Sequence, residues 1–541
     1  MEIFKVKDLN FKYALGTEKA VNNVSFTVSR GEFVTMCGAT GSGKSTLLKL
    51  LKREISPVGD KSGEILFMGH PIEDMENRDS AAKIGFVMQD PEQQIVTDKV
   101  WHELAFGLEN LGLDNAVIRR RVSEMASYFG IESWFEKSVR ELSGGQKQLL
   151  NLASVMVMQP EVLLLDEPTA QLDPIAAADF IATVAKLNRE TALTVIISEH
   201  RPENVISVSD KLMALDHGEI LAFGDTRETV AKLTGNARFM EGMPAAVRLF
   251  SGLNLKGACP LDVSEGRRFI EDNFKNDIRE LPKKLRERSE EKVLEFKNVN
   301  FRYGKDLPDV IRNMSFEVRK GEIFCLLGGN GSGKSTTLAL AAGLKQAYAG
   351  EIRVFGKKIR EYKAGSLYRG CVAMLPQDVQ ALFIGDSVKE ELQEVKFKPD
   401  MFPFDLSPFA ERHPFDLSGG EQQLLGLAKV MAAEPRLLLL DEPTKGLDAY
   451  AKKEIAGVLR KLKGLGLSIV FVTHDTEFAA AVADRCALVF RGEVTSEGET
   501  RQFFSENNFY TTAVNRMTRG FYDGILRVRE AEEIIHLNGG H

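Results

Sequence analysis

The feature that most constrains this 541-residue chain is an internal repeat. Residues 9–13 recur as residues 299–303, 290 positions later, and matching segments follow in the same order until His200 and His474, which are 274 positions apart. The second half lacks about 13 residues near its middle. Ordered repetition over this length indicates a duplication. Because the chain is also long enough for more than one hydrophobic core, we expect two domains of the same fold.

Each half contains the sequence patterns of strands and helices in a similar order. Segments such as residues 25–28 alternate in polarity between glycines, which predicts antiparallel strands. The continuous apolar runs at 162–165 and 194–197 are typical of strands buried on both faces of a parallel sheet. Helical stretches alternate with these runs, for example at 175–187 and 452–462. We therefore expect an α/β fold in each half, with an antiparallel β subdomain and a helical insert.

Composition excludes several classes of protein. Lys and Arg number 70 against 77 Asp and Glu, so there is no basic surplus for nucleic acid. The five cysteines are never spaced as C-x-x-C, so we expect no iron–sulfur cluster, zinc cluster or disulfide framework, as suits a reducing cytosol. No 18 consecutive residues are apolar, and the first ten lack the apolar core of a signal peptide. We expect a chain that does not itself span a membrane.

A phosphate-loop pattern, G-x-x-x-x-G-K-[ST], occurs once in each half between an apolar run and a helical stretch. Glycines let the backbone turn its N–H groups toward phosphates, and the helix N-terminus adds positive potential. The lysine is expected to bind the β- and γ-phosphates and the next serine to bind Mg²⁺. The predicted ATP-binding residues are Gly38, Gly41, Gly43, Lys44, Ser45 and Thr46 in the first half, and Gly328, Gly331, Gly333, Lys334, Ser335 and Thr336 in the second.

Two carboxylates follow a buried strand at the same place in both halves. They are Asp166 and Glu167 after the run at 162–165, and Asp441 and Glu442 after the run at 437–440. The aspartate is expected to orient Mg²⁺, and the glutamate to polarise the water that attacks the phosphate. A simpler reading is that these residues only begin the loop before the next helix.

The sequences L-S-G-G-Q at 142–146 and L-S-G-G-E at 417–421 make a resemblance specific. With them, residues 1–225 and residues 293–500 each resemble a nucleotide-binding domain of ATP-binding cassette (ABC) proteins. The resemblance implies that the chain has two P-loop NTPase domains in tandem. Residues 226–292 then form a helical, charged linker, and residues 501–541 a C-terminal extension without a recognisable motif, in which Gly520-Phe521 and Glu530 to Glu533 are expected to be surface helix rather than a site. The resemblance implies an internal pseudo-dimer that binds two ATP molecules at the interface of its domains.

In that family each ATP lies between the phosphate loop of one domain and the Ser-Gly-Gly of the other. Ser143 and Gly145 would thus complete the site on Lys334, and Ser418 and Gly420 the site on Lys44. In that family an aromatic residue also stacks on adenine, a glutamine contacts Mg²⁺, a histidine contacts the γ-phosphate, and an aspartate lies at the interface of the two domains (the dimer seam). These match, in that order, Tyr13 and Tyr303, Gln89 and Gln377, His200 and His474, and Asp173 and Asp448.

Neither half has lost any of these residues, so the resemblance implies that both sites hydrolyse ATP. The implied catalytic residues are Glu167, Glu442, His200 and His474, and the implied Mg²⁺ ligands are Ser45, Gln89, Asp166, Ser335, Gln377 and Asp441. One difference is Glu421, which stands where the first half has Gln146 and adds negative charge beside a triphosphate site.

Residues 89–94, residues 100–113 and Ser198-Glu199-His200-Arg201 resemble a subgroup, the ATPases of energy-coupling factor (ECF) transporters. Those work at the cytoplasmic face of the membrane with a membrane-embedded coupling subunit and a substrate-binding membrane subunit, and they import vitamins or Co²⁺ and Ni²⁺. The inserts at 90–140 and 378–415 would then receive coupling helices, or would simply pack on their own core.

Two alternatives to the ECF reading are kept. One is a soluble twin-cassette ATPase that acts on ribosomes or nucleic acid, and the other is the fused ATPase of a sugar or peptide importer. In a transporter of this kind the choice of substrate resides in a different polypeptide, so this sequence does not identify the transported substrate.

Overall fold

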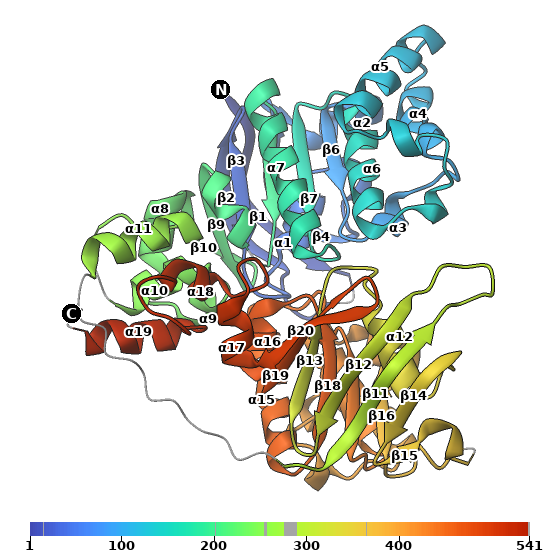
Figure 1. Ribbon diagram of the computed structural model, residues 1–541. Coiled ribbons are helices and arrows are strands. Elements are labelled where there is room, and N and C mark those ends of the chain that lie inside the picture. Colours follow the sequence, from blue (N-terminus) through green and yellow to red (C-terminus); the bar gives the residue numbers. More distant parts are fainter. Residues whose placement is uncertain (15, 201, 254–256, 275–288, 364, 539–541) are drawn as a thin grey trace. The chain divides into compact units, whose positions relative to one another are not determined.

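The computed structural model describes residues 1–14, 16–200, 202–253, 257–274, 289–363 and 365–538 (Figure 1). It divides into two compact units, Met1–Val247 with Lys256–Asp262, and Arg248–Leu255 with Val263–His541. Residues 283–288 of the expected charged linker lie outside the described residues.

The first unit is built from two sheets. A four-stranded antiparallel sheet has the order β2 (Val21–Ser29), β1 (Glu2–Tyr13), β4 (Gly59–Phe67), β5 (His70–Pro71). A six-stranded sheet has the order β10 (Glu219–Asp225), β9 (Lys211–Asp216), β3 (Phe33–Cys37), β8 (Thr194–Ser198), β7 (Val162–Asp166), β6 (Ile84–Val87). All of its pairs are parallel except β9 with β10.

The second unit repeats this topology strand for strand. Its antiparallel sheet is β12 (Ile311–Arg319), β11 (Lys292–Phe301), β14 (Ala349–Val354), β15 (Lys357–Lys358). Its six-stranded sheet is β20 (Glu493–Glu499), β19 (Arg485–Phe490), β13 (Ile323–Leu327), β18 (Ser468–Thr473), β17 (Leu437–Asp441), β16 (Val372–Leu375). The α/β fold predicted for both halves is confirmed.

Helices cover the sheets and form the inserts. The first unit has α1 (Lys44–Leu50), α2 (Asn77–Lys83), α3 (Pro91–Gln94), α4 (Val100–Asn110), α5 (Asn115–Tyr128), α6 (Gly144–Met156), α7 (Pro174–Thr191), α8 (Thr226–Leu233) and α9 (Ala237–Glu241). The division between the units passes through α10 (Ala245–Gly252). The second unit has α11 (Val263–Asn273), α12 (Lys334–Ala341), α13 (Val388–Glu394), α14 (Gly419–Met431), α15 (Ala449–Gly464), α16 (Thr476–Val482), α17 (Thr500–Glu506), α18 (Ala513–Thr518) and α19 (Val528–Leu537).

The two inserts differ more than the repeat suggested. The first contains α3, α4 and α5, whereas the described part of the second contains α13 followed by short 3-10 turns at Pro399–Met401, Ser407–Phe409 and Pro414–Asp416. Proline lacks the N–H that an α-helix needs and clashes with the preceding turn, so the proline-rich stretch cannot form a second long helix. The second insert is therefore helical only in part.

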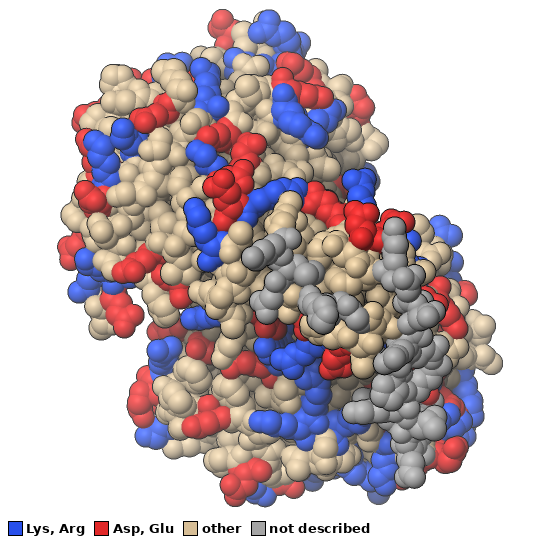
Figure 2. All heavy atoms as spheres, turned by 90° about the vertical axis from the view of Figure 1, so that its left-hand side faces the viewer, with Lys and Arg blue, Asp and Glu red and all other residues tan. Residues whose placement is uncertain are grey.

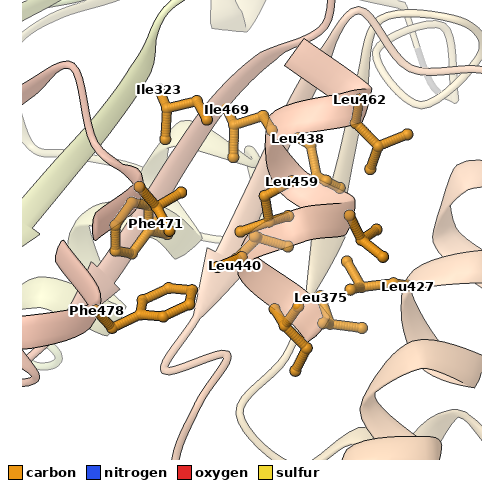
Figure 3. Close-up of a cluster of buried hydrophobic side chains, with 14 of the residues drawn as sticks. Ile323, Leu375, Leu427, Leu438, Leu440, Leu459, Leu462, Ile469, Phe471 and Phe478 are labelled. Carbon is orange, nitrogen blue, oxygen red and sulfur yellow. The ribbon is translucent and has the colours of Figure 1, made fainter. Parts of the chain in front are cut away.

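The core of the second unit lies between its parallel sheet and helices α14 to α16 (Figure 3). Leu438 and Leu440 of β17, Phe471 of β18, Leu459 of α15 and Phe478 of α16 pack there, and all are buried. Every residue of β13, β17 and β18 is buried, which explains why these strands are apolar except at Asp441, Ser468 and Thr473 at their ends. This packing holds the carboxyl ends of the strands, where the candidate site lies, in fixed positions.

The C-terminal segment is more deeply integrated than a surface helix. Phe503 and Phe504 of α17 are buried in the core of the second unit. In α11 the Arg267 guanidinium donates to the carbonyls of Arg516 and Arg519, at the end of α18. The acidic residues Glu530 to Glu533 lie on the amphipathic α19, whereas α17 and α18 bury most of their apolar side chains. Among the described helices, none has both the length and the apolar character needed to cross a bilayer.

Candidate functional site

The first phosphate loop joins β3 to α1 and places a lysine at its centre. Gly43, the N-cap of α1, has a φ of 98°, and a Cβ there would lie 2.3 Å from the carbonyl oxygen of Ala20, so only glycine fits. Lys44 is buried, and its Nζ donates to the carbonyl oxygens of Gly38 (2.9 Å) and Ala39 (3.0 Å). The loop backbone therefore holds the lysine amine at the mouth of the loop.

The carboxyl ends of β7 and β8 bring a carboxylate to this loop. The Ser45 hydroxyl donates to Asp166 Oδ1 at 2.8 Å, and the Ser198 hydroxyl donates to the same oxygen at 2.8 Å. Burial is the largest influence on this carboxyl, and it raises the pKa of Asp166. The result is a pair of oxygen groups, one hydroxyl and one carboxylate, beside the phosphate loop.

Glu167 is the centre of the first site. Its Oε1 lies 2.6 Å from His200 Nε2 and 3.9 Å from Lys44 Nζ, and its Oε2 accepts a hydrogen bond from Gln89 Nε2 at 3.1 Å. Its backbone has a φ of 45°, a left-handed conformation that is uncommon for a residue with a side chain. The structure thus gathers the predicted base, histidine, lysine and glutamine around one buried carboxylate.

The second site repeats the geometry of the phosphate loop. Lys334 Nζ donates to the carbonyl oxygens of Gly328 (2.9 Å) and Gly329 (3.0 Å). The Ser335 hydroxyl donates to Asp441 Oδ1 at 2.8 Å, as in the first site, and burial again raises the pKa of the aspartate.

The second glutamate has a different set of partners. Glu442 has a φ of 48°, close to that of Glu167, but its Oε1 lies 3.2 Å from His474 Nδ1, the other nitrogen of the imidazole ring. Its Oε2 is buried and has no hydrogen-bond partner in the described part of the chain. Gln377, the counterpart of Gln89, is exposed. The two sites therefore share the hydrogen bonds of their phosphate loops but differ in the partners of the glutamate.

A tyrosine lies against the first turn of each loop helix. The hydroxyl of Tyr13 is 2.9 Å from Thr46 Oγ1, and that of Tyr303 is 3.0 Å from Thr336 Oγ1. The tyrosines are 40% and 58% exposed, and Lys345 Nζ lies over the ring of Tyr303, 5.4 Å from its centroid. The position of the tyrosines suits the adenine stacking that the sequence predicts for both.

The two Ser-Gly-Gly motifs begin α6 and α14 and cap them. The Ser143 hydroxyl accepts from the N–H of Gln146, whose side chain accepts from the N–H of Ser143, and Ser418 and Glu421 repeat this arrangement. Glu421 thus has a local structural role, because its carboxylate completes a capping box. Each motif also leaves its helix N-terminus available for an anion.

The predicted seam aspartates cap the neighbouring helices. The N–H of Ala176 donates to Asp173 Oδ1 at 2.9 Å at the start of α7, and the N–H of Ala451 donates to Asp448 Oδ1 at 2.8 Å at the start of α15. A Cβ on Gly145 would lie 3.5 Å from the Ala176 side chain. Within its own unit, the Ser-Gly-Gly therefore packs on the helix that follows the seam aspartate.

The oxygen groups at each loop fit a magnesium ion. Mg²⁺ prefers hard oxygen ligands, and Ser45 with Asp166, or Ser335 with Asp441, supplies a hydroxyl and a carboxylate oxygen 2.8 Å apart. In both loops a further hydroxyl, that of Ser42 or Ser332, is buried without a hydrogen-bond partner among the described residues. A phosphate oxygen would satisfy such a group.

Sequence reasoning missed some of the residues at the site. Ser42 and Ser332 occupy variable positions of the loop pattern, and their recurrence in both halves was the available signal. Ser198 lies in a segment that resembles ECF ATPases, but the sequence predicted no role for its hydroxyl. In the structure that hydroxyl donates to Asp166 and accepts from the N–H of Glu167 at 3.0 Å. Val472 replaces it in the second half, so the repeat itself could not identify it.

Comparison with known proteins gives a consistent result. Residues 21–170 and 311–445 match a family model described as "ABC transporter". A Bacillus anthracis protein named "Putative ABC transporter ATP-binding protein" is 39% identical over 526 residues, 95% of this chain and 95% of that protein. A Bacillus subtilis protein named "Putative HMP/thiamine import ATP-binding protein" is 29% identical over 517 residues, 93% of each.

A solved structure also spans both units. The archaeal ribosome recycling factor, in complex with a ribosomal stalk protein, covers 92% of this chain and 91% of its own, with a TM-score of 0.59 and 18% identity. At that identity the likeness shows a shared fold and nothing further.

Proposed function

This chain belongs to the ABC transporter family and is an ATPase with two nucleotide-binding domains, and from that premise we propose that it energises an ECF-type importer of a vitamin or a transition-metal ion. The observation that carries the proposal is its likeness, over 93% of both chains, to a protein whose name describes thiamine-precursor import. A partner role at ribosomes has only the shared fold in its favour.

Within each site we propose the following division of roles. Glu167 and Glu442 accept the proton of the attacking water, and His200 and His474 orient these carboxylates and contact the γ-phosphate. Lys44 and Lys334 bind the β- and γ-phosphates, and the adjacent serine and aspartate hold Mg²⁺, which supplies charge neutralisation of the phosphates when bound.

Each site is completed, in this proposal, by the Ser-Gly-Gly of the other unit. Ser418 and Gly420 serve the site on Lys44, and Ser143 and Gly145 serve the site on Lys334. Because one chain carries both domains, the effective concentration of each for the other is on the order of millimolar. Nucleotide binding therefore favours an intramolecular pair, and hydrolysis releases it.

The inserts are the proposed docking surfaces for the membrane-embedded coupling subunit. Val96 (67% exposed) and Trp101 (39%) lie on the first insert, and Ile384 (74%) and Phe415 (51%) lie on the second. Exposed apolar side chains on each insert suit contact with a coupling helix of the membrane subunit. In this account the protein is peripheral, at the cytoplasmic face of the membrane.

Charge distribution supports a protein partner over a nucleic acid. On the face that Figure 2 shows, Lys and Arg are interspersed with Asp and Glu rather than gathered in a basic stripe. Nucleic-acid binding depends on such a stripe and weakens steeply with salt.

Affinity purification of the chain from detergent-solubilised membranes, with mass spectrometry of the co-purifying proteins, tests the proposal. We expect a membrane-embedded coupling subunit and a small substrate-binding membrane subunit. The variant Val96→Asp/Ile384→Asp should lose both subunits and keep ATP turnover. Recovery of ribosomal proteins, or of sugar- or peptide-importer subunits, would contradict the ECF assignment.

A further inference from the structure

In the first unit a second contact lies beside the bond between Glu167 and His200. Thr169, two residues after the proposed base, donates from its hydroxyl to Glu199 Oε1 at 2.8 Å, and Glu199 directly precedes the histidine. Glu199 is only 3% exposed. Thr169 lies in a tight turn, because its carbonyl accepts from the N–H of Leu172 at 3.0 Å. This contact therefore adds to the bonds of Glu167 with His200 and Ser198 in joining the same two segments, residues 167–173 (the base loop) and 198–200 (the histidine loop).

The second unit cannot form this bond, because Thr473 stands where the first unit has Glu199. A different pair joins the histidine loop of this unit, residues 473–476, to α15, the helix that directly follows the corresponding base loop, residues 442–448. Lys452 Nζ lies 2.9 Å from Asp475 Oδ2, with the two side chains 13% and 7% exposed. Lys452 is in the first turn of α15, where its N–H donates to the carbonyl of Asp448.

Asp475 is held firmly by its neighbours. Its other carboxylate oxygen accepts from the N–H of Phe478 at 3.1 Å, and its own N–H donates to Thr473 Oγ1 at 3.0 Å. The first unit has Ala177 at the position of Lys452, so it cannot form this ion pair. Its Arg201, at the position of Asp475, lies outside the described residues. Each unit thus has one version of the link, and the two versions differ in chemistry.

We infer that the Thr169–Glu199 hydrogen bond and the Lys452–Asp475 ion pair have the same function in their respective units. Each holds the base loop of its unit against the histidine loop, so that Glu167 or Glu442 stays aligned with its histidine. Glu199, Lys452 and Asp475 are therefore positioning residues for ATP hydrolysis. The inference rests on the proposed function, since it takes the two glutamates as the bases.

The geometry indicates which kinetic constant should change. The hydrogen bonds described for Thr169, Lys452 and Asp475 are to the two loops and to α15 and α16. Loss of a link should therefore misalign the base without weakening nucleotide binding. Since a misplacement of about 1 Å can cost about 100-fold in rate, a partial loosening should lower kcat about tenfold and leave KM for ATP within about twofold.

The test uses the full chain with one site silenced at a time. In a Glu442→Gln background, turnover reports the first site, and Thr169→Val, which removes only the hydroxyl, is compared with Thr169→Ser, which keeps it. In a Glu167→Gln background, Lys452→Met is compared with Lys452→Arg. Lys461→Met removes the same charge from an exposed position of α15 and is the control.

We expect a tenfold lower kcat for Thr169→Val and Lys452→Met, recovery to within about threefold in the conservative variants, and no change for Lys461→Met. Equal kcat for Val and Ser at position 169, equal loss for Met and Arg at position 452, or a change in KM alone would overturn the inference. If Thr169→Val does not fold, Glu199→Met against Glu199→Gln, which keeps an acceptor oxygen, makes the same comparison.

Failure of the proposed function is distinguished by the background variants. If neither Glu167→Gln nor Glu442→Gln alone lowers turnover, the glutamates are not the bases, and the inference falls with the proposed function. If Glu167→Gln and Glu442→Gln each lower turnover, but the disruptive and conservative variants at positions 169 and 452 have equal kcat, the proposed function stands and the positioning role is wrong.

Discussion

At the scale of single residues, the sites hold charges where the protein interior disfavours them. Asp166 and Asp441 lie at the buried ends of parallel strands, and burial raises the pKa of both carboxyls. A folded-state pKa above the unfolded value means that stability is lost as pH rises through the interval between the two values. Burying the ionised form of either aspartate therefore costs stability in the nucleotide-free protein, while that form supplies the charge that Mg²⁺ requires.

Replacing either aspartate with asparagine should increase the stability of the protein and abolish ATP turnover at the altered site. We expect Asp166→Asn or Asp441→Asn to raise the free energy of unfolding at pH 7 by about 1 kcal/mol, because a costly buried charge is removed. The gain should shrink as the pH falls through the raised pKa of the wild-type carboxyl, because the protonated form carries no buried charge. Urea denaturation at pH 7 and pH 4, without nucleotide, measures this. ATP turnover at the altered site should be lost. An unchanged or lower stability at pH 7 would contradict the assignment of a burial cost.

Ser198 gives a second prediction at this scale. Its hydroxyl donates to Asp166 Oδ1, which also accepts from Ser45, and it accepts from the N–H of Glu167, which also donates to the Ser198 carbonyl. Ser198→Ala therefore removes one of two hydrogen bonds from each group, and we expect a loss of about 1 kcal/mol in unfolding free energy and reduced turnover at the first site. Ser154→Ala on α6, whose hydroxyl bonds only within its own helix, is the matched control and should change little. Equal effects of the two substitutions would argue against a special role for Ser198.

At the scale of elements, a buried glutamate fastens each insert in a different way. Glu103 of α4 accepts from the N–H groups of Val96 (3.1 Å) and Thr97 (2.8 Å). Glu391 of α13 accepts from two equivalent N–H groups, and it also forms an ion pair with the buried Lys429 of α14. The second insert, which has less helix, thus gains an ionic anchor to the core.

The substitution Lys429→Met tests how much the ion pair between Glu391 and Lys429 stabilises the protein. Removing one partner of a buried ion pair leaves the other charge uncompensated, and we expect a loss of about 3 kcal/mol in unfolding free energy. Lys398→Met breaks the exposed pair with Glu434 and should cost less than about 1 kcal/mol. Chemical denaturation of both variants provides the comparison. A similar small loss for both would show that Glu391 is satisfied by the backbone alone.

Much of the element structure could be predicted from the sequence. Strands β7 and β17 were predictable because a strand buried on both faces must be apolar throughout, and the phosphate loops because their glycines are required by backbone geometry. The second insert was harder, since its prolines replace helix with 3-10 turns. The link between Lys452 and Asp475 was not predictable, because residues 23 positions apart meet only after the core is packed.

At the scale of the whole molecule, the duplication yields two sites with the same residues but different hydrogen bonds at the glutamate. His200 approaches its glutamate through Nε2 and His474 through Nδ1. We expect both sites to hydrolyse ATP, so that Glu167→Gln and Glu442→Gln each lower turnover and the double variant abolishes it. Steady-state phosphate release measures this. Full turnover in one single variant and none in the other would mean that one site is inactive.

The cross-completion of the sites is the central claim, and one comparison in the intact chain tests it most directly. In a Lys334→Ala background, which leaves only the site on Lys44, vanadate trapping of nucleotide is measured after Ser418→Arg and after Ser143→Arg. If each pocket is closed by the opposite unit, Ser418→Arg should abolish trapping and Ser143→Arg should reduce it far less. The reverse order, or equal loss, would contradict the account.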